Sequence, residues 1–170
     1  METLYFDVLQ FIYHLALAVL VGGAFALGAA AAPAIFGPGG SAPREPPVLT
    51  RAQAGAIFGA ALARFDGLAI LAVIALALTT ILKATAFEVT GVPDPRLIAR
   101  WAALVLLALA TLYSSAWANP VARSIRARTP GFDDLPANSP ARLEFATLHA
   151  RSRRAMSLAV LIGLVAIFLS

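Results

Sequence analysis

The sequence predicts an all-α integral membrane protein, a bundle of four helices that forms a single domain over residues 1–170. Of the 170 residues, 60% are hydrophobic and only 13% are charged, whereas a soluble domain carries about 25% charged residues. The hydrophobic residues gather in four long stretches, which segments rich in proline, glycine and charge separate. A disordered chain is excluded because it would be poor in apolar residues.

The first apolar stretch, residues 8–36, predicts a membrane span over about residues 8–32. Gln10 and His14 are the strongly polar side chains within it. A cleaved signal peptide is the alternative, but the start of the chain is acidic and the apolar run is too long for one. We therefore expect this span to remain in the mature protein.

The second span follows a loop rich in glycine and proline at residues 37–47. Thr50 and Gln53 have the spacing of a capping box, in which a hydroxyl and an amide satisfy free backbone donors at a helix N-terminus. The chain is then apolar to Leu82, apart from Arg64 and Asp66. We expect a span over about residues 60–82, which Lys83 ends.

The third span is predicted over residues 97–118. Asp94-Pro95 provides an N-cap residue followed by proline at the first helical position, and tryptophans near both ends suit the membrane interfaces. We expect Asn119-Pro120 to break or kink the end of this helix.

Ser139-Pro140 repeats the start signal before the fourth span, predicted over about residues 150–169. Only residues 156–169 are uninterruptedly apolar. The charged turn before them must therefore lie near the lipid headgroups, with its arginine stems extended outward.

Four spans place both termini on one side of the membrane. Ten of the thirteen basic residues then fall on the opposite side, and the positive-inside rule assigns that side to the cytoplasm. We expect a multi-pass protein of the cell membrane, the inner membrane in a bacterium, with both termini on the non-cytoplasmic side.

Six polar residues are expected at similar depth near the cytoplasmic end of the bundle. A charge at membrane depth is costly and is usually paired, and Asp66 is predicted to pair with Arg153 or His149. The functional interpretation is a pocket for an ion, an anionic headgroup or a solute, and the favoured structural interpretation is a polar clasp that fixes the helix order. The six residues are Arg64, Asp66, Asn119, His149, Ser152 and Arg153.

Small residues recur every four positions in the first helix, at Ala24, Gly28 and Ala32. Such a ridge lets helices approach closely in a membrane. We expect it to pack within the bundle rather than in a dimer interface.

His14 and His149, the two histidines, suggest a pair of axial haem ligands as one hypothesis. Their predicted depths differ by roughly 20 Å at 1.5 Å per residue, which is too far for one iron. We therefore expect no cofactor and no metal, and a hydrogen bond from His14 within the bundle.

The sequence contains no nucleophile with a base, no phosphate-binding loop and no zinc motif, so we expect no enzymatic activity. The arginines of residues 119–154 are expected to contact anionic lipid headgroups. No aromatic residues alternate with them as in single-stranded nucleic-acid sites, so no nucleic-acid partner is expected.

Several short motifs, taken together, resemble the transmembrane protein 205-like family. That resemblance implies a four-span membrane protein of largely undefined activity, and members in animals are associated with tolerance of metal-containing drugs. The segment from His14 to Phe25 also resembles the first helix of copper-resistance protein D-like domains, although copper would need more methionine, histidine or cysteine. The motifs are His14-Leu15, Gly22-Gly23, Pro33 with Phe36, Arg51-Ala52-x-Ala54-Gly55 with Phe58, Asn119-Pro120, and Phe145-x-x-Leu148-His149-x-x-Ser152.

Two functional classes remain open. The first is a structural or accessory component of a membrane complex, with other membrane subunits as partners. The second is a membrane protein that handles a small solute, an ion or a metal through the polar cluster.

Overall fold

The computed structural model describes residues 2–36, 49–89 and 91–170. The predicted Gly/Pro-rich loop at residues 37–47 lies outside them. Within the described residues the regular structure is helical, without strands, as the all-α prediction requires.

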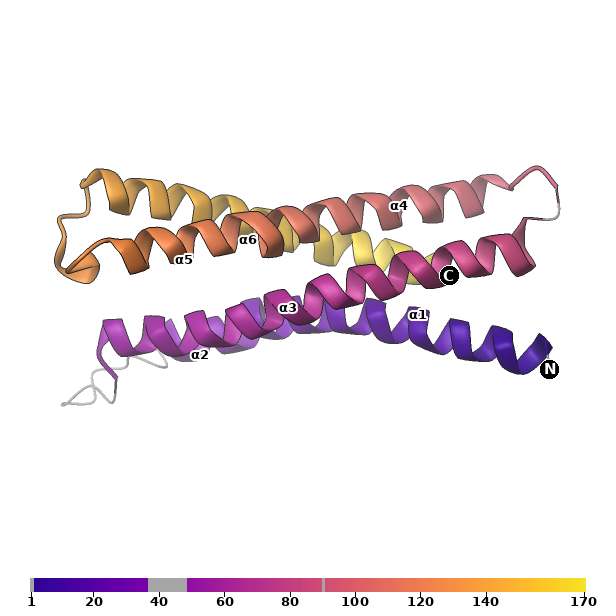
Figure 1. Cartoon of the computed structure of the whole chain (residues 1–170), viewed down its shortest axis with the longest axis horizontal. Helices are drawn as coiled ribbons and strands as arrows, with labels where there is room; N and C mark the ends of the chain where they lie inside the picture. Colours follow the sequence, from indigo (N-terminus) through magenta and orange to yellow (C-terminus); the bar gives the residue numbers. More distant parts are fainter. Residues whose placement is uncertain (1, 37–48, 90) are drawn as a thin grey trace.

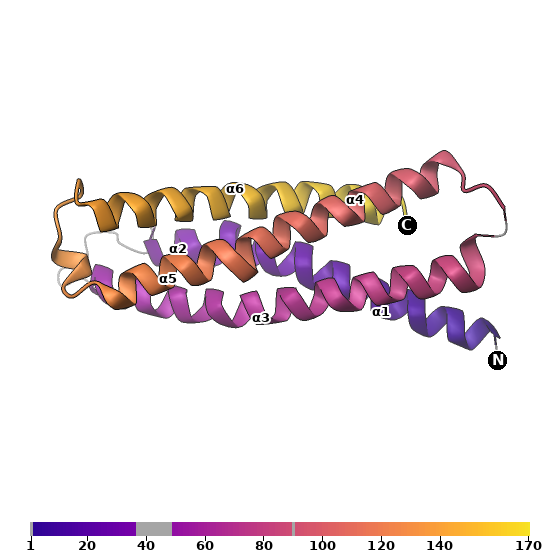
Figure 2. The same ribbon diagram turned by 45° about the horizontal axis from the view of Figure 1, so that its top comes forward.

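The described chain forms four continuous helical segments that lie side by side, with the two ends of the chain at the same end of the molecule (Figure 1). Residues 91–94 lie at that terminal end, and the 129–139 link lies at the opposite, loop end (Figure 2). α1 packs against α3 and α6, and α6 packs against α4 and α5. In chain order the elements are α1 (Glu2–Phe25), the π-helical turn η1 (Ala26–Ala31) and α2 (Ala32–Phe36); α3 (Arg51–Lys83) and the π-helical turn η2 (Ala84–Glu88); α4 (Pro95–Leu112), the π-helical turn η3 (Tyr113–Ala118) and α5 (Asn119–Arg128); the 3₁₀ turn η4 (Phe132–Asp134); and α6 (Pro140–Phe168).

The predicted helix starts are confirmed. The Thr50 hydroxyl accepts from the Gln53 amide at 3.2 Å while the Gln53 side chain accepts from the Thr50 amide at 2.9 Å, which completes the capping box. Asp94 caps α4 by accepting from the Leu97 amide at 2.9 Å. Ser139 precedes α6, but its hydroxyl makes no capping bond.

The predicted disruption at Asn119-Pro120 does not end the helix, which continues for ten residues as α5. Proline lacks the amide hydrogen that would bond to the carbonyl four residues earlier. The π-helical turn η3 ends directly before Asn119, and its wider register absorbs the missing bond.

Three of the helical segments have the length and hydropathy to cross a membrane: Thr3–Phe36, Ala52–Glu88 and Pro95–Arg128. Each is longer than the corresponding predicted span. α6 is not among them, because charged residues occupy its first half. A crossing by α6 therefore stays a prediction.

Small residues allow the closest helix contacts. A Cβ atom added at Gly163 would overlap Val21, and one added at Gly23 would overlap the Phe65 ring. Of the predicted ridge, only Ala24 is buried in the core. Gly28 has no neighbour within 4 Å of the position of a Cβ atom, and neither η1 nor α2 buries a residue.

Candidate functional site: two polar clusters at opposite ends

A chain of hydrogen bonds joins three helical segments about midway along α3 and α6, and we call it the Asp66 cluster. Asp66 is only 3% exposed; it accepts from Asn119 Nδ2 at 2.8 Å and pairs with Arg123 Nη1 at 2.5 Å. Ser152 on α6 donates to Asn119 Oδ1 at 2.5 Å, and its oxygen lies 2.7 Å from the Ser114 hydroxyl. One carboxylate meets one guanidinium, so the cluster is electrically balanced.

The predicted pairing of Asp66 with Arg153 or His149 is wrong. Arg153 and Arg64 are exposed, and Arg123 pairs with Asp66 instead. Arg123 lies four residues after Asn119 and so shares a helix face with it, a spacing that could have indicated it from the sequence. The six predicted residues thus divide into three that meet, at Asp66, Asn119 and Ser152, and three that do not.

His149 is half-buried and stacks on Phe145, with ring centroids 5.9 Å apart and planes inclined by 10°. Burial lowers the pKa of His149, and the positive charge of Arg153 lowers it further. A neutral imidazole is therefore favoured at this position near pH 7.

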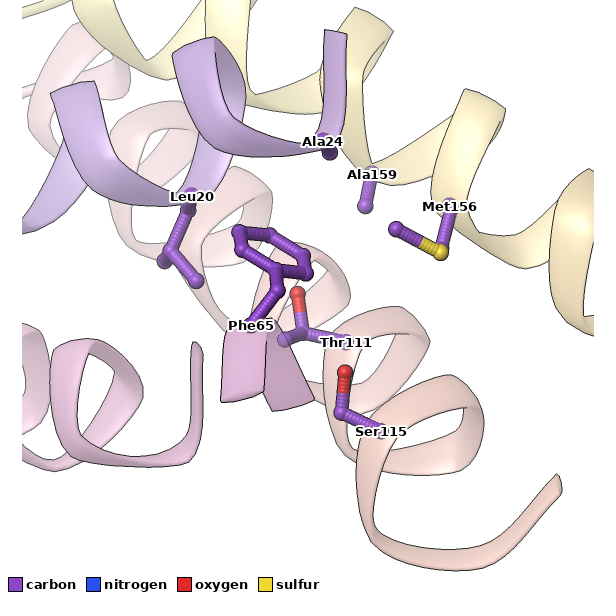
Figure 3. A pocket seen from close by; sticks show the side chains of 7 residues that line it. All are labelled: Leu20, Ala24, Phe65, Thr111, Ser115, Met156 and Ala159. Carbon is purple, nitrogen blue, oxygen red and sulfur yellow. The ribbon is translucent and has the colours of Figure 1, made fainter. Parts of the chain in front are cut away.

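Little space remains beside the Asp66 cluster. The cavity next to it has a volume of about 10 Å³ and is lined by side chains from α1, α3, α4, η3 and α6 (Figure 3). That volume is about the minimum for one water molecule. The lining residues are Leu20, Ala24, Phe65, Thr111, Ser115, Met156 and Ala159.

A second polar group, which we call the Glu88 cluster, lies near the terminal end. Glu88 pairs with both Lys83, at 3.4 Å, and Arg100. The Lys83 ammonium also lies 4.5 Å from the centroid of the Tyr13 ring, and the Tyr13 hydroxyl lies 3.2 Å from Ser170 Oγ. Lys83 is 2% exposed and Arg100 is 8% exposed. Two buried cations thus meet one carboxylate.

The sequence offered little sign of the Glu88 cluster. Lys83, Glu88 and Arg100 lie at the borders of apolar stretches, so the sequence pattern indicates only that a membrane span ends or begins there. The π-helical turn η2 carries Glu88 within reach of Lys83 and the start of α4. A departure from the α-helical period of this kind has no signature in hydropathy.

An open recess of about 360 Å³ adjoins the Glu88 cluster, between the start of α4 and the end of α6. We call it the α4–α6 recess. It is lined by Glu88, Asp94, Arg96, Leu97, Arg100, Leu169 and Ser170.

Unsatisfied polar atoms concentrate near the Glu88 cluster. In the described part of the chain, buried side-chain atoms without a hydrogen-bond partner occur at five residues, and four of them are at this end: Gln10 Oε1, Thr80 Oγ1, Arg100 Nε and Trp101 Nε1. No atom of the Asp66 cluster is among them. The two clusters therefore differ in both charge balance and hydrogen-bond satisfaction.

The histidines do not meet. His14 is exposed and bonds through Nδ1 to the Gln10 carbonyl at 2.9 Å, so its hydrogen bond is made within its own helix and not to another helix of the bundle. The part of the chain that the structure describes contains no group of three or more His, Cys, Asp or Glu side chains suited to a metal ion.

The comparisons with known proteins point to one family. The model of a domain of unknown function, DUF4149, matches residues 15–130, which is more than half of the chain. The chain belongs to this family. The match includes Asp66, Asn119 and Arg123 as well as the three charged residues of the Glu88 cluster, and ends before α6. No curated protein and no solved structure matches the chain. The DUF4149 match does not test the transmembrane protein 205-like or the copper-resistance protein D-like resemblance, so both stay predictions.

Proposed function

We propose that this DUF4149 protein crosses the cell membrane four times and serves as a structural or accessory component of a membrane complex. The observation that carries the proposal is the separation of the two polar clusters. Asp66 and Lys83 are 17 residues apart on α3, and Arg100 and Asn119 are 19 apart along α4 and η3. At 1.5 Å per residue these intervals are about 26 and 28 Å, close to the roughly 30 Å of a hydrocarbon core.

The second half of α6 has the side-chain pattern of a fourth crossing. Its large side chains face outward, with Leu161 62% exposed and Leu164 51% exposed. Its small residues Ala159, Gly163 and Ala166 are buried. Small residues at helix contacts and large apolar residues toward lipid are typical of membrane helices.

The orientation follows from the arginines. In the predicted four-span topology ten of the thirteen basic residues fall on the side of the loop end, which favours a cytoplasmic loop end and non-cytoplasmic termini. The anionic headgroups of that leaflet are then the partners of the exposed arginines.

The geometry of the Asp66 cluster favours the structural class over solute handling at that end. Its polar atoms are bonded to one another, and the adjacent cavity of about 10 Å³ has no room for a solute. A cluster of this kind fixes which helices are neighbours. The η1 turn and α2 consist largely of alanine and glycine yet bury no residue, which suits close packing against a helix of a partner subunit.

Purification of the full chain from its native membrane in a mild detergent tests the proposal. We expect a partner subunit to co-migrate stoichiometrically. Gly28→Leu should reduce that co-migration, whereas Gly67→Leu is the matched control because Gly67 likewise has nothing within 4 Å of a Cβ position. A monodisperse chain without any partner, or equal losses in the two variants, would contradict the accessory role.

A further inference from the structure

The α4–α6 recess is lined by two arginines and two carboxylates. Arg96 and Arg100 contribute two positive charges to its lining, and Glu88 and Asp94 contribute two negative charges; Lys83 pairs with Glu88 from outside the lining. Asp94 is already engaged as the cap of α4. Glu88 is shared between two cations. Both carboxylates of the lining are therefore already engaged within the protein.

Arg100 supplies a donor that the protein leaves unused. Its side chain is only 10% exposed and binds Glu88 through Nη2, while its buried Nε has no partner. A buried donor without a partner costs about 1–3 kcal/mol. Arg100 lines the recess, so its guanidinium borders a ligand held there, although the Nε atom itself is buried.

Arg96 provides a second guanidinium at the rim. It is exposed and donates to the Phe168 carbonyl at 3.2 Å through Nη2, which leaves its other N–H groups for a ligand. Both arginines lie in the first two turns of the 18-residue helix α4, where the positive end of the helix dipole also favours an anion.

We propose that the α4–α6 recess binds a phosphate ester, with Arg96 and Arg100 as its ligands. Guanidinium groups match the oxygens of a phosphate through paired N–H donors. The volume of about 360 Å³ is in the range of small-ligand sites. Leu97 and Leu169 add an apolar wall for the carbon portion of the ester.

Two sources can supply this chemistry. The recess lies about 28 Å from the Asp66 cluster along α4 and η3, at 1.5 Å per residue. On the four-span topology proposed above, on which this step rests, that distance places it at the depth of lipid headgroups. A phospholipid headgroup and a soluble phosphate ester therefore both meet the requirements, and experiment distinguishes them.

The test uses the full chain in a neutral detergent and follows the thermal unfolding midpoint during titration. The probes are dioctanoyl phosphatidylglycerol, dioctanoylglycerol, which lacks the phosphate, and glycerol 3-phosphate. We expect phosphatidylglycerol to raise the midpoint saturably, since a ligand that binds only the folded state stabilises it. Dioctanoylglycerol should give no saturable rise.

Two substitutions in the recess sharpen the test. Arg96→Gln removes an exposed rim charge without disturbing the core, and Arg100→Lys keeps a cation beside Glu88 but removes Nε. Each should weaken the apparent affinity about tenfold, which corresponds to about 1.4 kcal/mol. Arg64→Gln, an exposed arginine outside the recess, is the matched control and should bind like the unmodified chain.

Each result has one meaning. A response to phosphatidylglycerol alone assigns the site to a lipid headgroup, and an equal response to glycerol 3-phosphate assigns it to a soluble ester. The proposal would be overturned by equal responses to phosphatidylglycerol and dioctanoylglycerol or by no response to any probe. It would also be overturned if Arg64→Gln weakened the apparent affinity as much as Arg96→Gln.

Discussion

The Asp66 cluster and the Glu88 cluster are built from similar side chains but are completed to different degrees. In the first, one carboxylate meets one guanidinium, and amide and hydroxyl groups use the remaining donors and acceptors. In the second, one carboxylate meets two cations, and the buried Arg100 Nε has no partner. The difference teaches that a fully satisfied polar cluster holds helices together, whereas a partly satisfied one leaves buried polar groups uncompensated.

The largest expected effect comes from removing the carboxylate of the Asp66 cluster. Asp66→Ala leaves Arg123 and the Asn119 amide without their acceptor, so the free energy of unfolding should fall by about 3 kcal/mol. Asp134→Ala, at an exposed position, should change it by less than about 0.5 kcal/mol. Chemical unfolding in detergent measures both, and equal losses would contradict the central role of Asp66.

Double-substitution cycles sharpen the assignment of partners. Asp66→Ala combined with Arg123→Ala should show a coupling of about 1–2 kcal/mol, because the two side chains are in contact. Asp66→Ala combined with Arg153→Ala should be additive within about 0.5 kcal/mol. Coupling to Arg153 instead of Arg123 would restore the pairing that the sequence predicts.

Hydroxyl deletions compare the two clusters directly. Ser152→Ala leaves the buried Asn119 oxygen without its donor, so we expect a loss of about 1–2 kcal/mol. Tyr13→Phe should cost about 0.5 kcal/mol, because Ser170 Oγ keeps its bond to the Ala166 carbonyl at 2.7 Å. If Ser152→Ala and Tyr13→Phe lowered the free energy of unfolding by similar amounts, the hydrogen bonds of the two clusters would contribute equally to stability, which would contradict the comparison.

The smallest effect concerns pH at the loop end. Burial lowers the pKa of His149 below that of the unfolded chain, so the unfolded state binds more protons as the pH falls below about 6.5. Stability from the neutral imidazole is present above that pH and is lost as the pH falls through the folded pKa. The unfolding midpoint of His149→Gln should therefore depend less on pH between 7 and 5 than that of the unmodified chain, and an unchanged dependence would contradict this origin.

Much of the fold could be predicted from local signals. The capping box at Thr50 and the Asp94-Pro95 start act within a few residues, so the sequence places them directly. The continuation of the helix beyond Pro120 was not predicted, because the π-helical turn before it depends on the register of the whole segment.

The candidate sites were harder to predict than the helices. Asp66, Asn119 and Ser152 were placed at one depth by counting residues, and they do meet. Whether Arg123 or Arg153 pairs with Asp66 depends on the rotation of each helix about its axis, and hydropathy does not define that rotation. The Glu88 cluster was missed because its charges lie at span borders, where charge is expected in any membrane protein.

The most direct test compares the loss of one cation from each cluster. We predict that Arg123→Met lowers the free energy of unfolding by about 2 kcal/mol, since it leaves the buried Asp66 without a counter-charge and Arg123 itself is partly solvated. Lys83→Met should cost less than about 1 kcal/mol, because Glu88 keeps Arg100. Losses of equal size, or a larger loss from Lys83→Met, would contradict the distinction between a closed Asp66 cluster and an open Glu88 cluster.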